Sequence, residues 1–149
     1  MSSGVRVTEI NMAVYDLDEA MNDYDKMGFE EFRRFEAPEV PVQAKVANAR
    51  LGDNDVVLTV MASTESGSPI DRFLQKRGEG IFSITIFCDN LDETIERFKS
   101  AGVGFVLEEP RVIENNSLLG KTYRRSKVTW SRPKGAAHGL LFELWEHQE

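Results

Sequence analysis

Polar and hydrophobic residues alternate in two stretches of the chain, EINMAVYD at residues 9–16 and SITIFCDN at residues 83–90. Alternation with a period of two is typical of a β-strand that buries one face. Hydrophobic residues then recur at helical spacing after each stretch, which predicts a helix behind each strand. Asp16 and Asn90 are placed to cap these helices, and Gly28 and Gly102 mark their ends.

The two segments are copies of one unit, because residues 9–31 align with residues 83–105 without a gap. Three strand-like runs are expected after each helix, so that each copy is a βαβββ unit. The polar stretch at residues 108–120 is long for a connection and is predicted to be a mobile loop over a site. The expected runs are residues 29–36, 43–52 and 55–62 in the first copy, and 103–108, 121–131 and 138–146 in the second.

The repeat divides the chain into two modules, at residues 5–63 and 79–147. Between them, residues 68–78 predict a short linker helix that begins at Ser68-Pro69 and stops at Gly78. No low-complexity segment separates the modules, so residues 1–149 are expected to form a single domain.

Composition narrows the class of protein. The chain has 149 residues, of which 41% are hydrophobic, enough for one core, while no apolar run approaches the length of ~18 residues that a membrane span requires. The N-terminal residues lack the apolar core of a signal peptide. The single cysteine, Cys88, excludes an internal disulfide. We expect Cys88 to be buried as a small hydrophobic residue. A net charge of −7 argues against nucleic acid or a membrane surface as partner. We therefore predict a cytoplasmic location.

Strand alternation places several polar residues on the same faces as large apolar ones. Isolated carboxylates on a sheet are usually solvated. Here large apolar side chains share the same faces, which favours a concave pocket. The residues on these faces are Glu9, Asn11 and Tyr15, then Thr59 and Met61, then Ser83 and Phe87, and finally Glu143 and Trp145.

The paired units, the segments VYDLDEAMNDYDKMGF and CDNLDETIERFKSAGV, and the closing HGLLFELWE resemble the vicinal oxygen chelate (glyoxalase-like) superfamily. Within it, SPIDRFLQKRGEGIFSITIFCDNLDE and RPKGAAHGLLFEL are most similar to the methylmalonyl-CoA epimerase family. The resemblance implies an α+β fold in which two βαβββ modules form a cup-shaped, eight-stranded mixed sheet. It also implies a homodimer.

The resemblance further implies one divalent metal held by four side chains, at the positions of Glu9, Thr59, Ser83 and Glu143. Only Glu143 keeps the family's residue. Serine and threonine hydroxyls are poor ligands for zinc, cobalt or nickel, so a metal-free site is expected, with magnesium between the two carboxylates as the alternative. The family's second acid–base glutamate has no secure counterpart, although Glu36 and Glu39 lie near its position.

Two carboxylates suit proton transfer next to a carbonyl group, because one can donate while the other accepts. We expect Glu9 and Glu143 to be catalytic, with the hydroxyls of Ser83 and Thr59 binding an enolate oxygen. This predicts isomerase, epimerase or lyase chemistry on a small carbonyl compound or an acyl thioester. The alternatives are a protein that only sequesters an apolar ligand, with Tyr15, Met61, Phe87 and Trp145 as its walls, and a purely structural partner.

One basic segment stands out in this acidic chain: residues 121–134 hold six Lys or Arg residues and no acidic one. Arg124 and Arg132 are candidates to bind coenzyme A phosphates; the alternatives are an edge strand kept soluble by charge and ion pairs with acidic segments near Glu30, Glu31 and Asp53. His138 lies where it could reach a substrate. Both His138 and His147 are otherwise expected to be surface or turn histidines.

Overall fold

The computed structural model describes residues 4–35, 43–118 and 121–149, with backbone alone at residue 118. Within these residues it contains eight strands and three α-helices. The chain divides into two compact units. We call Glu9–Phe82 the N-terminal module, and Ser83–Glu149 together with residues 4–8 the C-terminal module.

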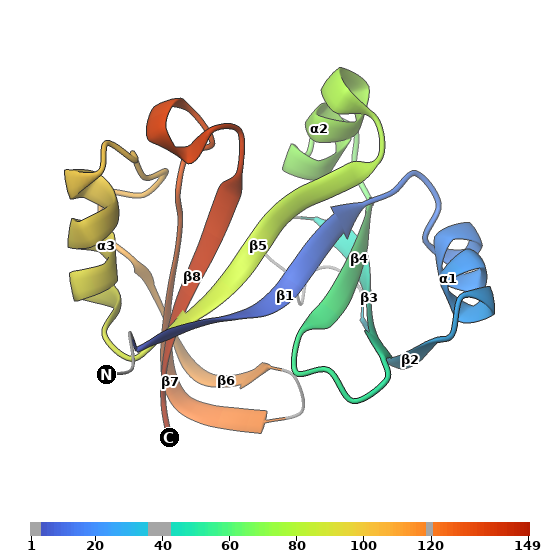
Figure 1. The fold of residues 1–149 in the computed structure, drawn as a ribbon, viewed down its shortest axis with the longest axis horizontal. Helices are drawn as coiled ribbons and strands as arrows, with labels where there is room; N and C mark the ends of the chain where they lie inside the picture. The colour runs from blue at the N-terminus through green and yellow to red at the C-terminus, as the bar shows by residue number, and fades with distance from the viewer. Residues whose placement is uncertain (1–3, 36–42, 119–120) are drawn as a thin grey trace. The chain divides into compact units, whose positions relative to one another are not determined.

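The N-terminal module is a four-stranded sheet with two helices (Figure 1). Its strands are hydrogen-bonded in the order β2-β3-β4-β1, and β1 runs parallel to β4 while the other neighbours are antiparallel. Residues 9–13 of β1 belong to this module. The elements are β1 (Val5–Ala13), α1 (Leu17–Lys26), β2 (Phe29–Phe35), β3 (Ala44–Leu51), β4 (Val57–Ser63) and α2 (Pro69–Arg77).

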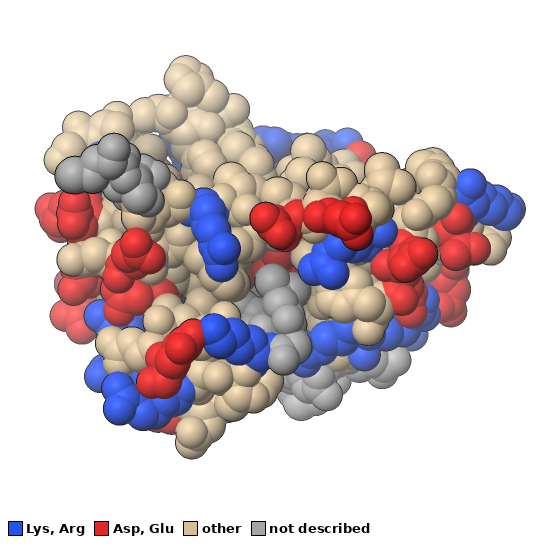
Figure 2. Space-filling view, turned by 60° about the horizontal axis from the view of Figure 1, so that its bottom comes forward, with Lys and Arg blue, Asp and Glu red and all other residues tan. Residues whose placement is uncertain are grey.

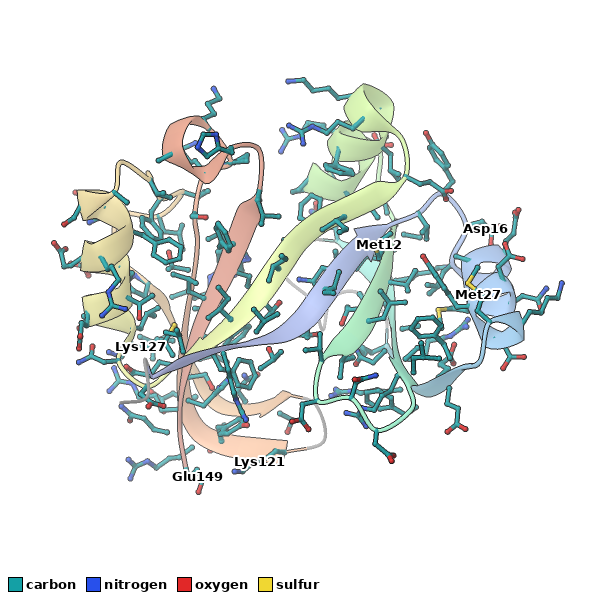
Figure 3. The ribbon with its side chains drawn as sticks, in the orientation of Figure 1. Met12, Asp16, Met27, Lys121, Lys127 and Glu149 are labelled. Carbon is teal, nitrogen blue, oxygen red and sulfur yellow. The ribbon has the colours of Figure 1, made fainter. Side chains whose placement is uncertain are left out.

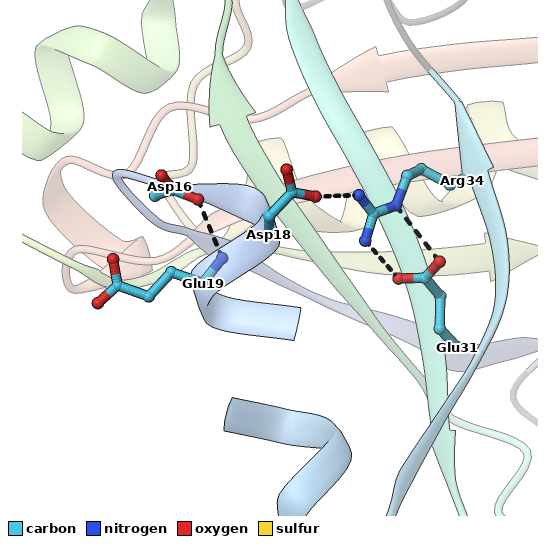
Figure 4. A network of polar contacts seen from close by, with 5 residues as sticks. All are labelled: Asp16, Asp18, Glu19, Glu31 and Arg34. Atoms are coloured by element: carbon cyan, nitrogen blue, oxygen red, sulfur yellow. Dashed lines mark hydrogen bonds and ion pairs between the residues drawn. The ribbon is translucent and has the colours of Figure 1, made fainter. Parts of the chain in front are cut away.

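Helix α1 begins at the predicted cap. The Asp16 carboxylate accepts the backbone N–H of Glu19 at 2.9 Å, which satisfies one of the free donors of the first turn (Figure 4). The helix ends just before Gly28, whose φ of 101° is in the left-handed region that glycine adopts without a steric cost. Figure 4 also shows Arg34 of β2, which binds Glu31 and Asp18 and so ties the strand to the helix.

The two helices of this module bury different parts of its sheet. Helix α1 contributes Leu17 and Met21 to a core that includes Val60. Helix α2 contributes Ile70 and Leu74 to a second core, which includes Ala13, Val46 and Met61. Ala13 and Met61 stand beside each other in the parallel β1–β4 pair. One end of the β1 face that carries Glu9 is therefore covered by α2.

The C-terminal module repeats the pattern (Figure 1). Its strands follow the order β5-β8-β7-β6, with β5 and β8 parallel. Residues 4–8 lie along β5, where Asp89 N–H donates to the Gly4 carbonyl at 2.7 Å and Thr8 Oγ1 to the Thr85 carbonyl at 3.4 Å. The elements are β5 (Gly80–Cys88), α3 (Leu91–Ser100), β6 (Arg111–Leu118), β7 (Lys121–Trp130), a short 3-10 turn (Gly135–Ala137) and β8 (Leu141–Gln148).

Helix α3 is capped by Asn90, whose side chain accepts Glu93 N–H at 3.1 Å. It packs Leu91 and Ile95 against Cys88 and Leu144, so the predicted burial of Cys88 is confirmed. The helix is followed by Gly102 at φ 97°, in the same left-handed conformation as Gly28. The α+β architecture of two βαβββ modules is thus the predicted one, and a cup formed by both stays a prediction.

The sequence-based prediction is wrong between residues 103 and 118. The expected strand at residues 103–108 is reduced to a single bridge between Phe105 and Ser131. The expected loop instead contains strand β6, which pairs with β7 in an antiparallel ladder; residues 119 and 120 of that segment lie outside the described residues. Strand β6 is on the edge of the module and carries polar residues, including Asn115 and Asn116, so its sequence resembles a loop. In the part of the chain that the structure describes, no helix is both long and apolar enough to cross a membrane.

Candidate functional site

A chain of buried polar side chains crosses the N-terminal module. Thr59 Oγ1 donates to Glu9 Oε1 at 2.6 Å, and Asn48 Nδ2 donates to Thr59 Oγ1 at 2.9 Å. The strand register explains the chain, because Asn11 and Asn48 stand on either side of Thr59. All four side chains are buried. Glu9 and Thr59, predicted from alternation to share a face, therefore do share it, and Asn48 is a member that sequence reasoning missed.

Two residues expected to form a pocket wall on this face do not do so. Tyr15 follows the end of β1 and is 66% exposed; its N–H donates to Glu79 Oε2 at 2.9 Å and its hydroxyl to the Leu74 carbonyl at 3.4 Å. Met61 is in the core beneath α2. The prediction of a pocket wall made of Tyr15 and Met61 is wrong, because the strand alternation stops at Ala13 and α2 covers the sheet beyond it.

In the C-terminal module, the carboxylate of Glu143 is held by two indoles. Trp145 Nε1 donates to Glu143 Oε1 at 2.6 Å, and Trp130 Nε1 donates to Glu143 Oε2 at 3.0 Å. Trp130 lies opposite Glu143 in the β7–β8 ladder, and Thr85 lies beside it in the parallel β5–β8 pair. Ser83 is buried two residues before Thr85 on the same face.

Burial raises the pKa of Glu143, and the two indole hydrogen bonds act in the opposite direction because they favour the charged form. The net direction is upward. A carboxylate in this position takes up a proton more readily than one in water, and two indole N–H groups orient it. Neither Trp130 nor Thr85 was among the predicted site residues, although strand alternation places Thr85 on the face of Ser83.

A cation also lies over one of these two indoles. The guanidinium of Arg111 is 5.5 Å from the centre of the Trp130 ring, whose N–H binds Glu143. Arg111 comes from β6, the strand that the sequence presented as a loop. Arg124 and Arg132, the two predicted phosphate-binding residues, are exposed, and within residues 4–35, 43–118 and 121–149 neither forms an ion pair of 4 Å or less.

Half of the basic segment is neutralised by neighbouring acids. The face in Figure 2 shows basic and acidic side chains interspersed. Three ion pairs of the basic segment support the ion-pairing alternative. Their acidic partners come from β6 and the end of the chain, and not from Glu30, Glu31 or Asp53. The pairs are Lys121–Glu149, Arg125–Glu114 at 3.7 Å and Lys127–Glu146 at 3.5 Å.

His147 is part of an aromatic cluster. Its ring stacks on Tyr123 at 4.0 Å and on Trp145 at 5.2 Å between centroids, and it meets Phe87 edge-on at 4.5 Å. Its Nδ1 is 2.6 Å from Ser126 Oγ. Burial, assisted by the charge of Lys121, lowers the pKa of His147 to about 4. The prediction of a surface histidine is wrong here, because the β7–β8 pairing encloses the ring.

The other histidine behaves as expected. His138 is exposed and ends the 3-10 turn with φ 53°, a left-handed conformation. It is therefore a turn histidine, and its proposed reach to a substrate stays a prediction. Phe87 and Trp145, predicted as substrate contacts, both direct their rings at His147.

Side chains at three of the four predicted metal-ligand positions already make hydrogen bonds to protein groups, and a metal-free site stays a prediction. Each oxygen of Glu143 already accepts an indole N–H, and the Thr59 hydroxyl directs its proton at Glu9. Among the described residues, no group of three or more His, Cys, Asp and Glu side chains is arranged to hold a metal. Glu9 and Thr59 belong to one module and Ser83 and Glu143 to the other, so the convergence of these four residues stays a prediction.

Comparisons with known proteins agree with this architecture. The family model described as the Glyoxalase/Bleomycin resistance protein/Dioxygenase superfamily matches residues 9–118. The methylmalonyl-CoA epimerase of Mycobacterium tuberculosis is 27% identical with a TM-score of 0.78, over 100% of this chain and 93% of that one. A variant of the Streptomyces coelicolor methylmalonyl-CoA epimerase, in complex with 2-nitronate-propionyl-CoA, is 26% identical with a TM-score of 0.75, over 97% of this chain and 98% of that one. An uncharacterized protein of Bacillus subtilis is 27% identical over 95% of this chain and 91% of its own.

Proposed function

The chain belongs to the glyoxalase/bleomycin resistance protein/dioxygenase superfamily, and we propose that it is an isomerase that moves a proton at the carbon next to the carbonyl of an acyl thioester. Two observations support this substrate class. The similar solved structures include methylmalonyl-CoA epimerases, one of them in complex with an acyl-CoA ligand. The chain itself places one carboxylate in each module: Glu9 is buried, and Glu143 is half-buried and has its pKa raised by desolvation.

The observation that carries the proposal is the state of Glu143. A general base must be oriented toward the proton it takes, and its pKa must be high enough to hold that proton during the reaction. The indoles of Trp130 and Trp145 fix the carboxylate plane, and burial raises the pKa. The proton acceptor in this proposal is therefore Glu143.

Glu9 takes the complementary role of returning a proton to the opposite side of the carbon. Its carboxylate is buried and is bonded through Thr59 to Asn48. The hydroxyls of Ser83 and Thr85, both buried, are proposed to donate to the enolate oxygen that develops when the proton leaves. The scheme routes no step through a metal ion, and the hydrogen bonds that the indoles and Thr59 already make to Glu143 and Glu9 support that choice.

Exchange of the substrate proton for solvent deuterium tests the proposal. An acyl thioester with an acidic carbon-bound proton, such as methylmalonyl-CoA, would be incubated with the protein in deuterated water and followed by NMR or mass spectrometry. We expect catalysed exchange that falls by about a hundredfold or more in Glu143→Gln, because the amide cannot accept the proton.

The matched control is Glu114→Gln, which removes an exposed carboxylate from β6 and should leave exchange unchanged. Equal exchange in the Glu143→Gln and Glu114→Gln proteins would refute the role of Glu143. A saturable change in tryptophan fluorescence without any exchange would instead identify a protein that only sequesters its ligand. Assembly as a homodimer is part of the proposal, and sedimentation equilibrium would test it.

A further inference from the structure

A cavity lies in the C-terminal module, and Glu143 is not among its lining residues. It has a volume of about 360 Å³ and is bordered by residues 4–6, the end of β5, the start of β7 and the end of the chain. Its lining combines two cations, Arg6 and Lys121, with the aromatic rings of Phe87, Tyr123 and His147. The lining is more polar than apolar, and charged groups beside aromatic rings suit a small organic ion.

Among the described residues, no carboxylate forms an ion pair with Arg6. The Arg6 guanidinium lies 5.9 Å from the centre of the Phe87 ring. Arg6 is also close enough to Lys121 to influence it. The hydrogen bond to Glu149 raises the pKa of Lys121, and the charge of Arg6 acts in the opposite direction. Two neighbouring cations that disfavour one another would both be stabilised by an anion between them.

Lys121 already holds a carboxylate, that of Glu149 (Figure 3). Both side chains are largely exposed, so this ion pair is weak and its partner can be exchanged. The pair with Glu149 shows that the Lys121 ammonium can bind a carboxylate at this position. The other acidic residue of the lining, Asp89, lies against Gly4.

His147 adds a donor without an acceptor. Asn116 Nδ2 donates to Ser126 Oγ at 3.3 Å, and the only described acceptor for the Ser126 proton is His147 Nδ1 at 2.6 Å. This pattern places the remaining ring proton on Nε2, which is buried and has no hydrogen-bond partner among the described residues. In a ring that lines the cavity, an unpaired N–H leaves the positive end of its dipole uncompensated.

We propose that this cavity binds a small organic carboxylate, with the anionic group between Arg6 and Lys121 and the apolar body against Phe87 and Tyr123. The ligand carboxylate displaces that of Glu149 from Lys121. The site is distinct from the proton-transfer chemistry at Glu143. The cavity is nevertheless connected to Glu143, because the stacked rings of Tyr123, His147 and Trp145 end in the indole that binds Glu143.

Benzoate is a suitable probe, with benzamide as its neutral counterpart of the same shape. Binding would be followed on the full chain by the long-range proton–nitrogen NMR signals of the His147 ring. We expect benzoate to shift these signals saturably and benzamide to leave them unchanged. In Arg6→Gln the dissociation constant should rise about tenfold, as for the loss of one charge-assisted hydrogen bond.

A second variant tests the direction of the effect. Glu149→Gln frees Lys121 and should tighten benzoate binding several-fold, whereas a nonspecific effect would not respond. Arg97→Gln and Glu93→Gln, which break an exposed ion pair on α3, are matched for charge and should change nothing. The proposal is overturned if benzoate causes no saturable shift, if benzamide binds equally well, or if Arg6→Gln behaves like Arg97→Gln.

Discussion

The indole N–H of Trp145 reaches the Glu143 carboxylate at 2.6 Å, although the two residues are separated by a single position on β8. Side chains two positions apart on a strand project from the same face, so this contact is fixed by the backbone of one strand. Trp130, opposite Glu143 on β7, binds the other oxygen and makes the orientation of the carboxylate a property of the β7–β8 ladder.

Trp130→Phe should raise the pKa of Glu143 further, because it removes an N–H bond that favours the charged carboxylate. The rising limb of the exchange rate against pH would then move to higher pH. Phenylalanine keeps a ring beneath Arg111, so the change isolates the N–H group. The free energy of unfolding should fall by about 1–3 kcal/mol, measured by urea denaturation. An unchanged pH profile would show that the indole bond does not tune Glu143.

Arg111→Gln tests whether the cation beside Trp130 recognises an anionic part of the substrate. We expect KM for the acyl thioester to rise about tenfold while kcat changes little, as for the loss of one charge-assisted contact. Arg124→Gln is the matched control, because it removes one exposed cation from the neighbouring strand. If the Arg124→Gln protein shows the larger rise in KM, the assignment drawn from the sequence is correct and Arg111 is not the binding residue.

Thr59→Val should destabilise the protein by about 1–3 kcal/mol, because it removes a buried hydroxyl that bonds both Glu9 and Asn48. Thr122→Val changes an exposed threonine on β7 in the same way and should cost less than about 0.5 kcal/mol. Thermal and urea unfolding would measure both. Equal losses in the two variants would contradict a structural role for the Glu9–Thr59–Asn48 chain.

His147 should make stability depend on pH in the acidic range. Its folded pKa of about 4 lies below the ordinary value of 6.5, so the fold favours the neutral ring. This contribution is fully present above about pH 6.5 and is lost as the pH falls toward 4. In His147→Phe, the unfolding free energy should change less between these pH values than in the wild type. A His138→Phe protein, altered at the exposed histidine, should keep the wild-type pH dependence and serves as the control.

The sequence by itself determined the repeated unit. Asp16 and Asn90 predict where the two helices begin, and Gly28 and Gly102 predict where they end. These predictions hold because helix capping and a left-handed backbone depend on the residue itself and its nearest neighbours. Alternation along single strands placed Glu9 on one buried face and Glu143 on another for the same local reason.

Only the tertiary structure decided which side chains meet on those faces. The pairing of β7 with β8 brings Trp130 to Glu143 and encloses His147, and the pairing of β6 with β7 carries Arg111 to the same place. Helix α2 packs over Ala13 and Met61, so the part of the sheet that alternation predicted to line a pocket is buried in the core. These contacts depend on the register between strands distant in sequence, which no local periodicity encodes.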